Sequence, residues 1–424
     1  MPMPKISNHQ AASKQVLRWL VMVAGLVGPA LAAENWPQFR GPRGDGQSAA
    51  HGLPLTFGEG KNILWKTPVH GKAWSSPVIW DQQIWMTTAS PDGSELGAMC
   101  IDAETGRIVH DVVVFKIATP QFCHPMNSYA TPTPVVENGR LYIHFGVHGT
   151  ACLDTTTANT LWTRQDFACN HFRGPASSPI VVGDLLVLTF DGYDVQYLVA
   201  LAKASGKTAW RRDRNIIYDT ADNDYHKAYS TPALITVQGQ QQLVSPSAGA
   251  TIAYQPQTGE EIWRVRSGGM NAAALPLFGN GLVYATSAAG GFKLFAVRPD
   301  GRGDVTATNV AWKFDKNVPT RSSQILVGER LFMISDSGTI SCIEAKSGQS
   351  VWQQRLGGPF SASPLCADGR IYFSGEDGTI HVVAVADTYQ LLATNHLDDG
   401  FMASPAVYQS SLILRSRNHL YRIK

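Results

Sequence analysis

The sequence predicts an all-β fold, an eight-bladed β-propeller of four-stranded blades whose last blade is closed by an N-terminal strand. Short Val/Ile/Leu/Tyr-rich runs are separated by Gly, Asp and Asn, which is typical of strands and turns. The same two-strand pattern recurs along the chain, and an isolated strand pattern precedes the first copy. With 424 residues, 44% of them hydrophobic, the chain can bury a large core. Its formal net charge of +2 gives no overall field that would attract nucleic acid.

The repeating unit is a small polar residue, usually before Pro, followed by a strand, a tight turn and a second strand. "SSPVIWDQQIWMTT" (75–88) and "SSPIVVGDLLVLTF" (177–190) are clear copies. Units begin near residues 75, 131, 177, 230, 273, 322, 361 and 403. Residues 61–424 number 364, or 45.5 per unit, which is within the range of about 40–50 for a propeller blade.

A second motif, a turn glycine followed by tryptophan, comes after most units, as in "LAKASGKTAW" (201–210) and "IEAKSGQSVW" (343–352). The glycine supplies the positive φ of a hairpin turn. The tryptophan lies four residues later, where it begins a fourth strand and can pack between units. In "TTTANTLW" (155–162) the glycine is missing, and we expect Asn159 to take the left-handed position. The tryptophan is replaced in "GRIVHD" (106–111) and "TYQLLA" (388–393).

The N-terminal strand "NILWKTPV" (62–69) looks like a fourth strand without a blade of its own. The eighth unit ends at Lys424, too early for its fourth strand. Pairing the two segments closes the ring and removes two exposed sheet edges.

An export signal is predicted at residues 1–32, because basic residues precede the apolar stretch "WLVMVAGLVGPALA" (19–32). We expect cleavage near Ala32, a short extension over 33–60 and the propeller over 61–424. The protein would then be periplasmic or secreted, with no integral membrane span; an uncleaved anchor is the alternative. No cysteine follows the small-residue site, so a lipid anchor is not indicated.

The "A-x-[ST]-G-x-x-x-W" turns resemble the signature of the PQQ-type, or quinoprotein-like, propeller repeat. The segment "ENWPQFRGPRGDG" (34–46) is similar to the N-terminal part of exported PQQ-repeat proteins abundant in planctomycete-type bacteria. The resemblance covers most of the chain and implies the propeller fold. Proteins with this repeat include quinoprotein dehydrogenases and also non-enzymatic scaffolds, such as the outer-membrane barrel-assembly propeller.

The resemblance implies no catalytic residue for this chain. The alcohol dehydrogenases of the family hold PQQ against two adjacent cysteines, with Ca²⁺ bound by carboxylate and amide oxygens. Here no two cysteines are adjacent, and no C-x-x-C-H haem motif occurs. We therefore expect a binding scaffold without a catalytic or metal site. A PQQ- or metal-dependent oxidoreductase with Ca²⁺ at the channel mouth is the alternative, and a lyase or hydrolase of polysaccharides is a third.

A binding face is expected where the loops that lead into each blade meet the turns between second and third strands, at one mouth of the central channel. These segments hold an excess of Arg, His, Asp and aromatic residues, which suits a small anionic or sugar-like ligand or an envelope protein bound by a monomer. The candidate residues are Trp74, His124, Asn127, Tyr129, His148, His171, Arg173, Asp191, Tyr193, Asp224, His226, Lys227, Tyr229, Asn271, Arg321, Gln324, Asp398 and Asp399.

Two Cys/His pairs lie in consecutive loops of this face. Cys123 precedes the strand proline of its unit by 11 residues and Cys169 by 10, since 134−123 is 11 and 179−169 is 10. Matched cysteines in adjacent loops of an exported protein favour a disulfide over a thiolate metal site, so we predict a Cys123–Cys169 bond. Three other cysteines share one third-strand position and are expected to be small core residues: Cys100, Cys152 and Cys342.

Overall fold

The computed structural model describes residues 1–5 and 34–424. The chain divides into two units, Met1–Ala33 and Glu34–Lys424, and the architecture below is that of the second. The predicted signal peptide lies almost wholly outside the described residues. Within the described part of the chain, no helix has the length and hydrophobicity that crossing a bilayer requires.

Eight four-stranded antiparallel sheets form the blades of a propeller, as predicted. Blade 1 contains β3 (Val78–Trp80), β4 (Gln83–Ala89), β5 (Glu95–Asp102) and β6 (Ile108–Lys116), and blade 2 contains β7 (Val135–Glu137), β8 (Arg140–His144), β9 (Thr150–Asp154) and β10 (Thr160–Arg164). Blade 3 contains β11 (Ile180–Val182), β12 (Leu185–Asp191), β13 (Gln196–Ala202) and β14 (Thr208–Asp213). Blade 4 contains β15 (Ala233–Val237), β16 (Gln240–Pro246), β17 (Thr251–Tyr254) and β18 (Glu261–Val265).

The second half of the ring repeats this pattern. Blade 5 contains β19 (Leu277–Gly279), β20 (Leu282–Thr286), β21 (Leu294–Val297) and β23 (Val310–Phe314), and blade 6 contains β24 (Ile325–Val327), β25 (Arg330–Ile334), β26 (Thr339–Glu344) and β27 (Ser350–Arg355). Blade 7 contains β28 (Leu365–Ala367), β29 (Arg370–Ser374), β30 (Thr379–Ala384) and β31 (Leu391–His396). Blade 8 contains β32 (Ala406–Tyr408), β33 (Ser411–Arg415), β34 (His419–Ile423) and β2 (Ile63–Pro68). The short strands β1 (Gln47–Ser48) and β22 (Gly303–Asp304) add parallel edges to blades 7 and 4, and the 3-10 helices are η1 (Gly146–His148) and η2 (Asn223–His226).

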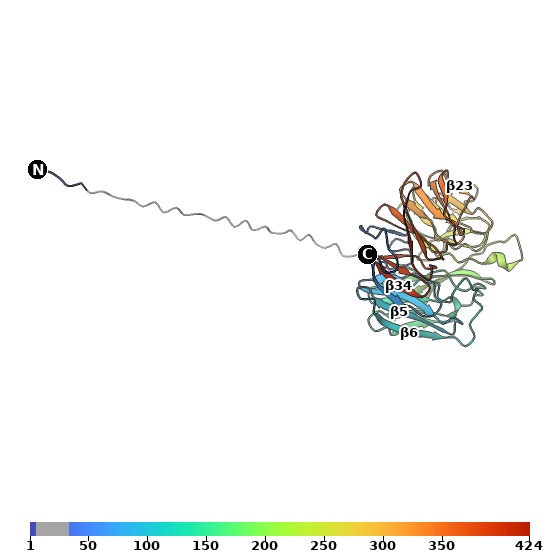
Figure 1. Ribbon diagram of the computed structural model, residues 1–424. Helices are drawn as coiled ribbons and strands as arrows, with labels where there is room; N and C mark the ends of the chain where they lie inside the picture. Colours follow the sequence, from blue (N-terminus) through green and yellow to red (C-terminus); the bar gives the residue numbers. More distant parts are fainter. Residues whose placement is uncertain (6–33) are drawn as a thin grey trace. The chain divides into compact units, whose positions relative to one another are not determined.

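The N-terminal strand closes the ring as predicted. β2 pairs antiparallel with β34, with Ile63 opposite Ile423 and Lys66 opposite Tyr421. Figure 1 labels the C-terminal strand β34 near β5 of the first blade, and residues of the two strands belong to one buried apolar cluster. The guanidinium of Arg415 adds a buried link, because it donates to the carbonyl and hydroxyl oxygens of Ser75 over 3.0 and 2.6 Å.

Each fourth-strand tryptophan packs in the seam under the next blade. The indole N–H of Trp162 donates to the carbonyl of Lys203 over 2.8 Å, and a Cβ added to Gly206 would lie 2.7 Å from the same ring. The same arrangement recurs at Trp65 with Gly106, Trp210 with Gly259 and Trp312 with Gly348. The turn therefore needs glycine for two reasons: the backbone has a positive φ there, and the indole ring approaches too closely for a side chain.

Blade 2 departs from this rule and corrects one prediction. Ala158, with φ of 57°, occupies the left-handed turn position, whereas Asn159 was expected there. The preceding blade carries His110 at the tryptophan position, opposite Cys100 in the sheet register. Because the fourth strand of blade 1 carries His110 and not an indole at this position, a methyl group fits where the other turns need glycine. The prediction failed because it weighed only local backbone preference and not the neighbouring blade.

A ring of hydroxyl groups ties the innermost strands together around the channel. In each link, the backbone N–H of the residue two positions before a first strand donates to the hydroxyl of the equivalent residue in the next blade. Seven links of 2.9–3.0 Å join Ser76 to Thr133, Thr133 to Ser178, Ser178 to Thr231, Leu275 to Ser323, Ser323 to Ser363, Ser363 to Ser404 and Ser404 to Ser76. Only Leu275 lacks a hydroxyl, and it packs in an apolar cluster with Phe39.

The extension before β2 crosses the end of the channel opposite the inter-blade loops. Trp36 exchanges backbone hydrogen bonds of 2.9 and 2.7 Å with Ile79 of blade 1. Arg40 donates to the carbonyl of Gln324 in blade 6 over 2.6 Å. β1 then pairs with β28 of blade 7. The extension therefore belongs to the folded propeller and closes one end of its channel.

Candidate functional site: the channel mouth

The central channel contains a cavity of about 430 Å³. Its floor includes Phe39 of the N-terminal extension, and its wall includes the hydroxyl ring described above. The inter-blade loops surround the open end, which we call the loop face. Seven of the sequence-predicted residues line this cavity: Trp74, His124, Asn127, Arg173, Tyr229, Asn271 and Arg321.

Two cations of the cavity wall differ in their surroundings. Arg321 lies 3.4 Å from a carboxylate oxygen of Asp336 and 3.2 Å from one of Glu376, so its charge is balanced. Asp336 also accepts a hydrogen bond from Thr320. No described carboxylate lies within 4.0 Å of the Arg173 guanidinium, and its buried Nε–H has no acceptor among the described residues. Arg173 is therefore the unbalanced charge of the cavity.

Asp191, another predicted site residue, lies in the protein interior. It forms a fully buried ion pair with Arg214, whose Nε and Nη2 donate to the two carboxylate oxygens over 2.6 and 2.7 Å. Burial opposes the charge of Arg214, but the Asp191 carboxylate outweighs it and raises the pKa. The pair fixes the start of the long loop between blades 3 and 4.

That long loop uses its own predicted residues internally. The side chain of Lys227 is fully buried, and its ammonium donates to the carbonyl and carboxylate of Asp224. The His226 ring stacks on Tyr218 with centroids 3.9 Å apart. These contacts hold the loop and leave none of the three predicted side chains directed into the cavity.

Two of the predicted histidines, His148 and His171, are buried in blades 2 and 3. His171 is buried and stacks on Phe190, and burial lowers its pKa to about 4. His148 accepts a hydrogen bond from the backbone N–H of Gln121 over 3.1 Å. Tyr129 packs edge-on against that imidazole. Both imidazoles are packed into the blades and do not line the cavity, and Nε2 of His171 has no hydrogen-bond partner among the described residues.

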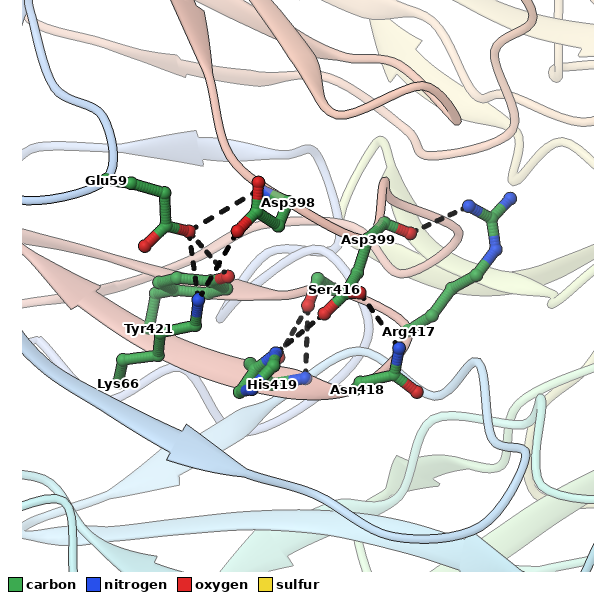
Figure 2. A network of polar contacts seen from close by, with 9 residues as sticks. All are labelled: Glu59, Lys66, Asp398, Asp399, Ser416, Arg417, Asn418, His419 and Tyr421. Atoms are coloured by element: carbon green, nitrogen blue, oxygen red, sulfur yellow. Dashed lines mark hydrogen bonds and ion pairs between the residues drawn. The ribbon is translucent and has the colours of Figure 1, made fainter.

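Three more predicted residues take structural roles. Asp398 and Asp399 belong to a polar network of blade 8 that does not line the cavity (Figure 2). Asp399 accepts from the imidazole Nδ1 of His419 over 2.6 Å and from Asn418 over 2.9 Å. Burial alone would raise the pKa of Asp399, but these hydrogen bonds lower it. Gln324 is buried beside Arg40 at the closed end.

The predicted Cys123–Cys169 disulfide does not form in the structure, where both cysteines are free thiols. The Cys123 thiol lies 3.7 Å from the carbonyl of Arg173, whereas the Cys169 thiol is buried 3.7 Å from Nδ1 of His171. The similar spacing before the strand prolines does not bring the two sulfurs together, since Cys169 packs into the core of its blade. Burial raises the pKa of the Cys123 thiol to about 11 and that of Cys169 well above its usual value.

Several cavity residues were missed by sequence reasoning. Phe39 comes from the extension, and its long-range contact leaves no local signal. The wall hydroxyls had a signal, the small polar residue before each strand proline, but we interpreted it only as a mark of the repeat. Met126 and Met402 at the mouth lie in loops where only polar and aromatic residues were considered.

The cavity does not fit PQQ with Ca²⁺. Among the described lining residues, only Asp336 carries a carboxylate, and Arg321 and Thr320 already engage it. The described residues contain no group of three or more His, Cys, Asp or Glu side chains that could hold a metal ion. Calcium requires six to eight oxygen ligands, which this donor set does not offer.

Comparison with known proteins identifies relatives over most of the chain. The family model described as "Outer membrane protein assembly factor BamB" matches residues 62–212, 194–302 and 301–391. The assembly factor BamB of Shewanella oneidensis is 24% identical over 308 residues, which cover 68% of this chain and 72% of the relative. BamB of Francisella salina is 25% identical over 248 residues, covering 56% of this chain and 42% of the relative.

Solved structures show the same fold at low sequence identity. BamB from Moraxella catarrhalis superposes with a TM-score of 0.59 at 13% identity, covering 85% of this chain and 99% of that one. A quinohemoprotein alcohol dehydrogenase from Comamonas testosteroni gives 0.67 at 11% identity, covering 92% and 80%. The repeat, the ring of eight blades and the family match agree: the chain belongs to the BamB-like family of PQQ-repeat β-propellers.

Proposed function

We propose that the protein is an exported, non-catalytic scaffold that takes part in assembling outer-membrane proteins and docks a partner protein on its loop face. The family description and both curated relatives carry the words "outer membrane protein assembly factor". The predicted signal peptide supports export to the periplasm, where such a partner would be met. We propose that the scaffold acts as a monomer.

The observation that carries the proposal is an apolar rim, largely exposed, on the loops that lead into blades 2, 3 and 4 and on the turn between β12 and β13. We define the apolar rim as Phe122, Met126, Phe172, Tyr193, Ile217 and Tyr225. Phe122 is 61% exposed and Ile217 77%, although both are large apolar side chains. Phe172 links neighbouring loops, with ring centroids 6.3 Å from Phe122 and 5.6 Å from Tyr193. Apolar groups gathered on one exposed face mark interaction sites.

Several charges of the loop face other than Arg173 are already paired within the protein. Lys227 binds Asp224 and also lies 5.1 Å from the centre of the Phe172 ring. Arg321 and Arg417 both approach Glu376. A partner that covers the rim therefore buries aromatic surface without separating these ion pairs, which is the usual composition of an interface core. The occupant we propose is an extended, apolar-rich segment of an outer-membrane assembly component.

Photo-cross-linking tests the proposal in cells that naturally make the protein. A benzoylphenylalanine residue replaces Phe172 in the rim, and in the control it replaces Leu161, which is 50% exposed on the outer strand β10. We expect a discrete product at Phe172 that contains an outer-membrane protein or a component of its assembly machinery, identified by mass spectrometry. Products of equal yield at both positions, or none at Phe172, would refute docking at the rim.

A further inference from the structure

The channel cavity is shaped as a pocket with one opening. Phe39 and the N-terminal extension close its floor, so a molecule enters and leaves through the loop face. Its volume of about 430 Å³ falls in the range of about 300–1,000 Å³ that small-molecule pockets occupy. Of the rim residues only Met126 also lines this pocket, and the inference below does not rest on the proposed docking function.

The lower wall of the pocket suits an apolar body. The hydroxyl oxygens of Ser76, Thr133 and Ser178 each accept a backbone hydrogen bond from the neighbouring blade. Their acceptor capacity is therefore partly used by the fold. Further apolar lining comes from Phe39 at the floor, from Ala176, Ala273 and Ala289, and from Trp74 and Met402 in the loops at the mouth.

The upper wall offers one unbalanced positive charge. Arg321 is balanced by Asp336 and Glu376, but Arg173 meets no described carboxylate, and its Nε–H is buried without an acceptor. A buried donor without an acceptor is costly, and a charged acceptor makes the strongest hydrogen bonds to a guanidinium. The pocket also contains a buried acceptor, Oδ1 of Asn271, that no described donor reaches.

We propose that the pocket binds a small organic monocarboxylate with an apolar body and one N–H or O–H donor. The carboxylate pairs with Arg173, the donor bonds to Asn271, and the apolar body extends toward Phe39. One uncompensated cation matches one negative charge. A tricarboxylate such as PQQ would place two further carboxylates where no free cation lies among the described lining residues.

Calorimetric titration of the purified protein, with no partner present, tests this proposal. The probe is N-acetyl-phenylalanine, which has one carboxylate, one amide N–H and an apolar ring; the matched neutral probe is N-acetyl-phenylalaninamide. We expect saturable binding of the acid and binding of the amide weaker by about tenfold or more, the effect of a charge-assisted hydrogen bond. Arg173→Gln should abolish this difference, and Arg173→Lys should retain part of it.

Two control variants separate binding from folding. Arg212→Gln removes an equal charge from the outer strand of blade 3, away from the pocket, and should bind the acid like the unchanged protein. Ala273→Phe fills the pocket and should abolish binding while circular dichroism and thermal unfolding of the free protein stay the same. A peptide ending in phenylalanine distinguishes a protein C-terminus from a free acid as the source of the carboxylate; binding of either supports the pocket.

Three outcomes would overturn the proposal. They are equal affinity for the acid and the amide, unchanged acid binding by Arg173→Gln, and tighter binding of PQQ than of N-acetyl-phenylalanine. Failure of these titrations would leave rim docking intact, because the cross-linking test uses a different surface and does not depend on the pocket.

Discussion

The backbone N–H of Ser404 donates to the hydroxyl of Ser76 over 3.0 Å, joining residues 328 positions apart in the sequence. This bond closes the hydroxyl ring between the last and first blades. It lies inside the same seam that Arg415 spans. The hydroxyl ring thus holds the blades at a fixed distance around the channel. Because its residues form part of the cavity wall, it also keeps the shape of the candidate pocket constant.

Ser76→Ala should destabilise the propeller, because it leaves the buried N–H of Ser404 without its acceptor. We expect a loss of about 1–3 kcal/mol in the free energy of unfolding, measured by urea denaturation. Ser350→Ala, at an exposed strand position, is the control and should change it by less than about 0.5 kcal/mol. Equal effects of the two substitutions would show that the ring bond carries no stability.

The seam between blades 1 and 2 should accept a tryptophan only if the facing turn is changed too. His110→Trp alone is expected to overpack against the methyl group of Ala158 and cost about 1–3 kcal/mol. Adding Ala158→Gly restores the pair found in other seams, such as Trp162 with Gly206. A double-mutant cycle followed by thermal unfolding measures the coupling. Additive effects of the two substitutions would contradict the packing rule.

These seams also show what the sequence could and could not predict. The repeat is a local pattern of neighbouring residues. The strand pairs, the turn glycines and the unpaired strand with Trp65 can therefore be recognised in the sequence alone, and they predict the eight blades that the structure contains. The position of Ala158 depends on a residue 48 positions earlier, since 158−110 is 48, and no local preference contains it. The site was predicted in part for the same reason. Their positions in the loops were enough to place Arg173 and Arg321 at the mouth. Whether an aspartate such as Asp191 faces solvent or a buried arginine depends on contacts with residues distant in the sequence, which no local pattern reveals.

Acid should destabilise the protein through two buried histidines. Burial lowers the pKa of His144 to about 3 and that of His171 to about 4, from an ordinary value of 6.5. Below pH 6.5 the unfolded chain therefore binds protons that the native protein does not, and stability falls as the pH drops toward 4. Each histidine contributes a slope of up to about 1.4 kcal/mol per pH unit.

His171→Phe isolates the contribution of one histidine to this pH dependence of stability. The substitution keeps an aromatic ring on Phe190 and removes the titrating group. Denaturant unfolding between pH 7 and pH 4 should then show a dependence on pH that is shallower by about one proton. A slope identical to that of the unchanged protein would mean that His171 titrates normally.

All six cysteines should be thiols in the protein isolated from its natural compartment. Cys123 and Cys169 face different groups, and burial raises the pKa of both, which disfavours the reactive thiolate. Denaturation in iodoacetamide without reductant, followed by mass spectrometry, should add six carbamidomethyl groups. A product with four groups and a linked peptide containing Cys123 and Cys169 would reinstate the disulfide.

The apolar rim is the surface on which we propose that the partner protein docks, and the protein's effect on the outer membrane tests this role directly. Phe122→Ser/Phe172→Ser is expressed in cells that lack their own copy of the gene, beside the matched control Leu161→Ser/Leu391→Ser, which changes two exposed residues of outer strands. Quantitative mass spectrometry then measures outer-membrane proteins in the envelope at equal levels of each variant. We expect outer-membrane proteins to fall to the level of the deletion strain with the rim variant and to return to the normal level with the control. Full restoration by the rim variant would contradict this role.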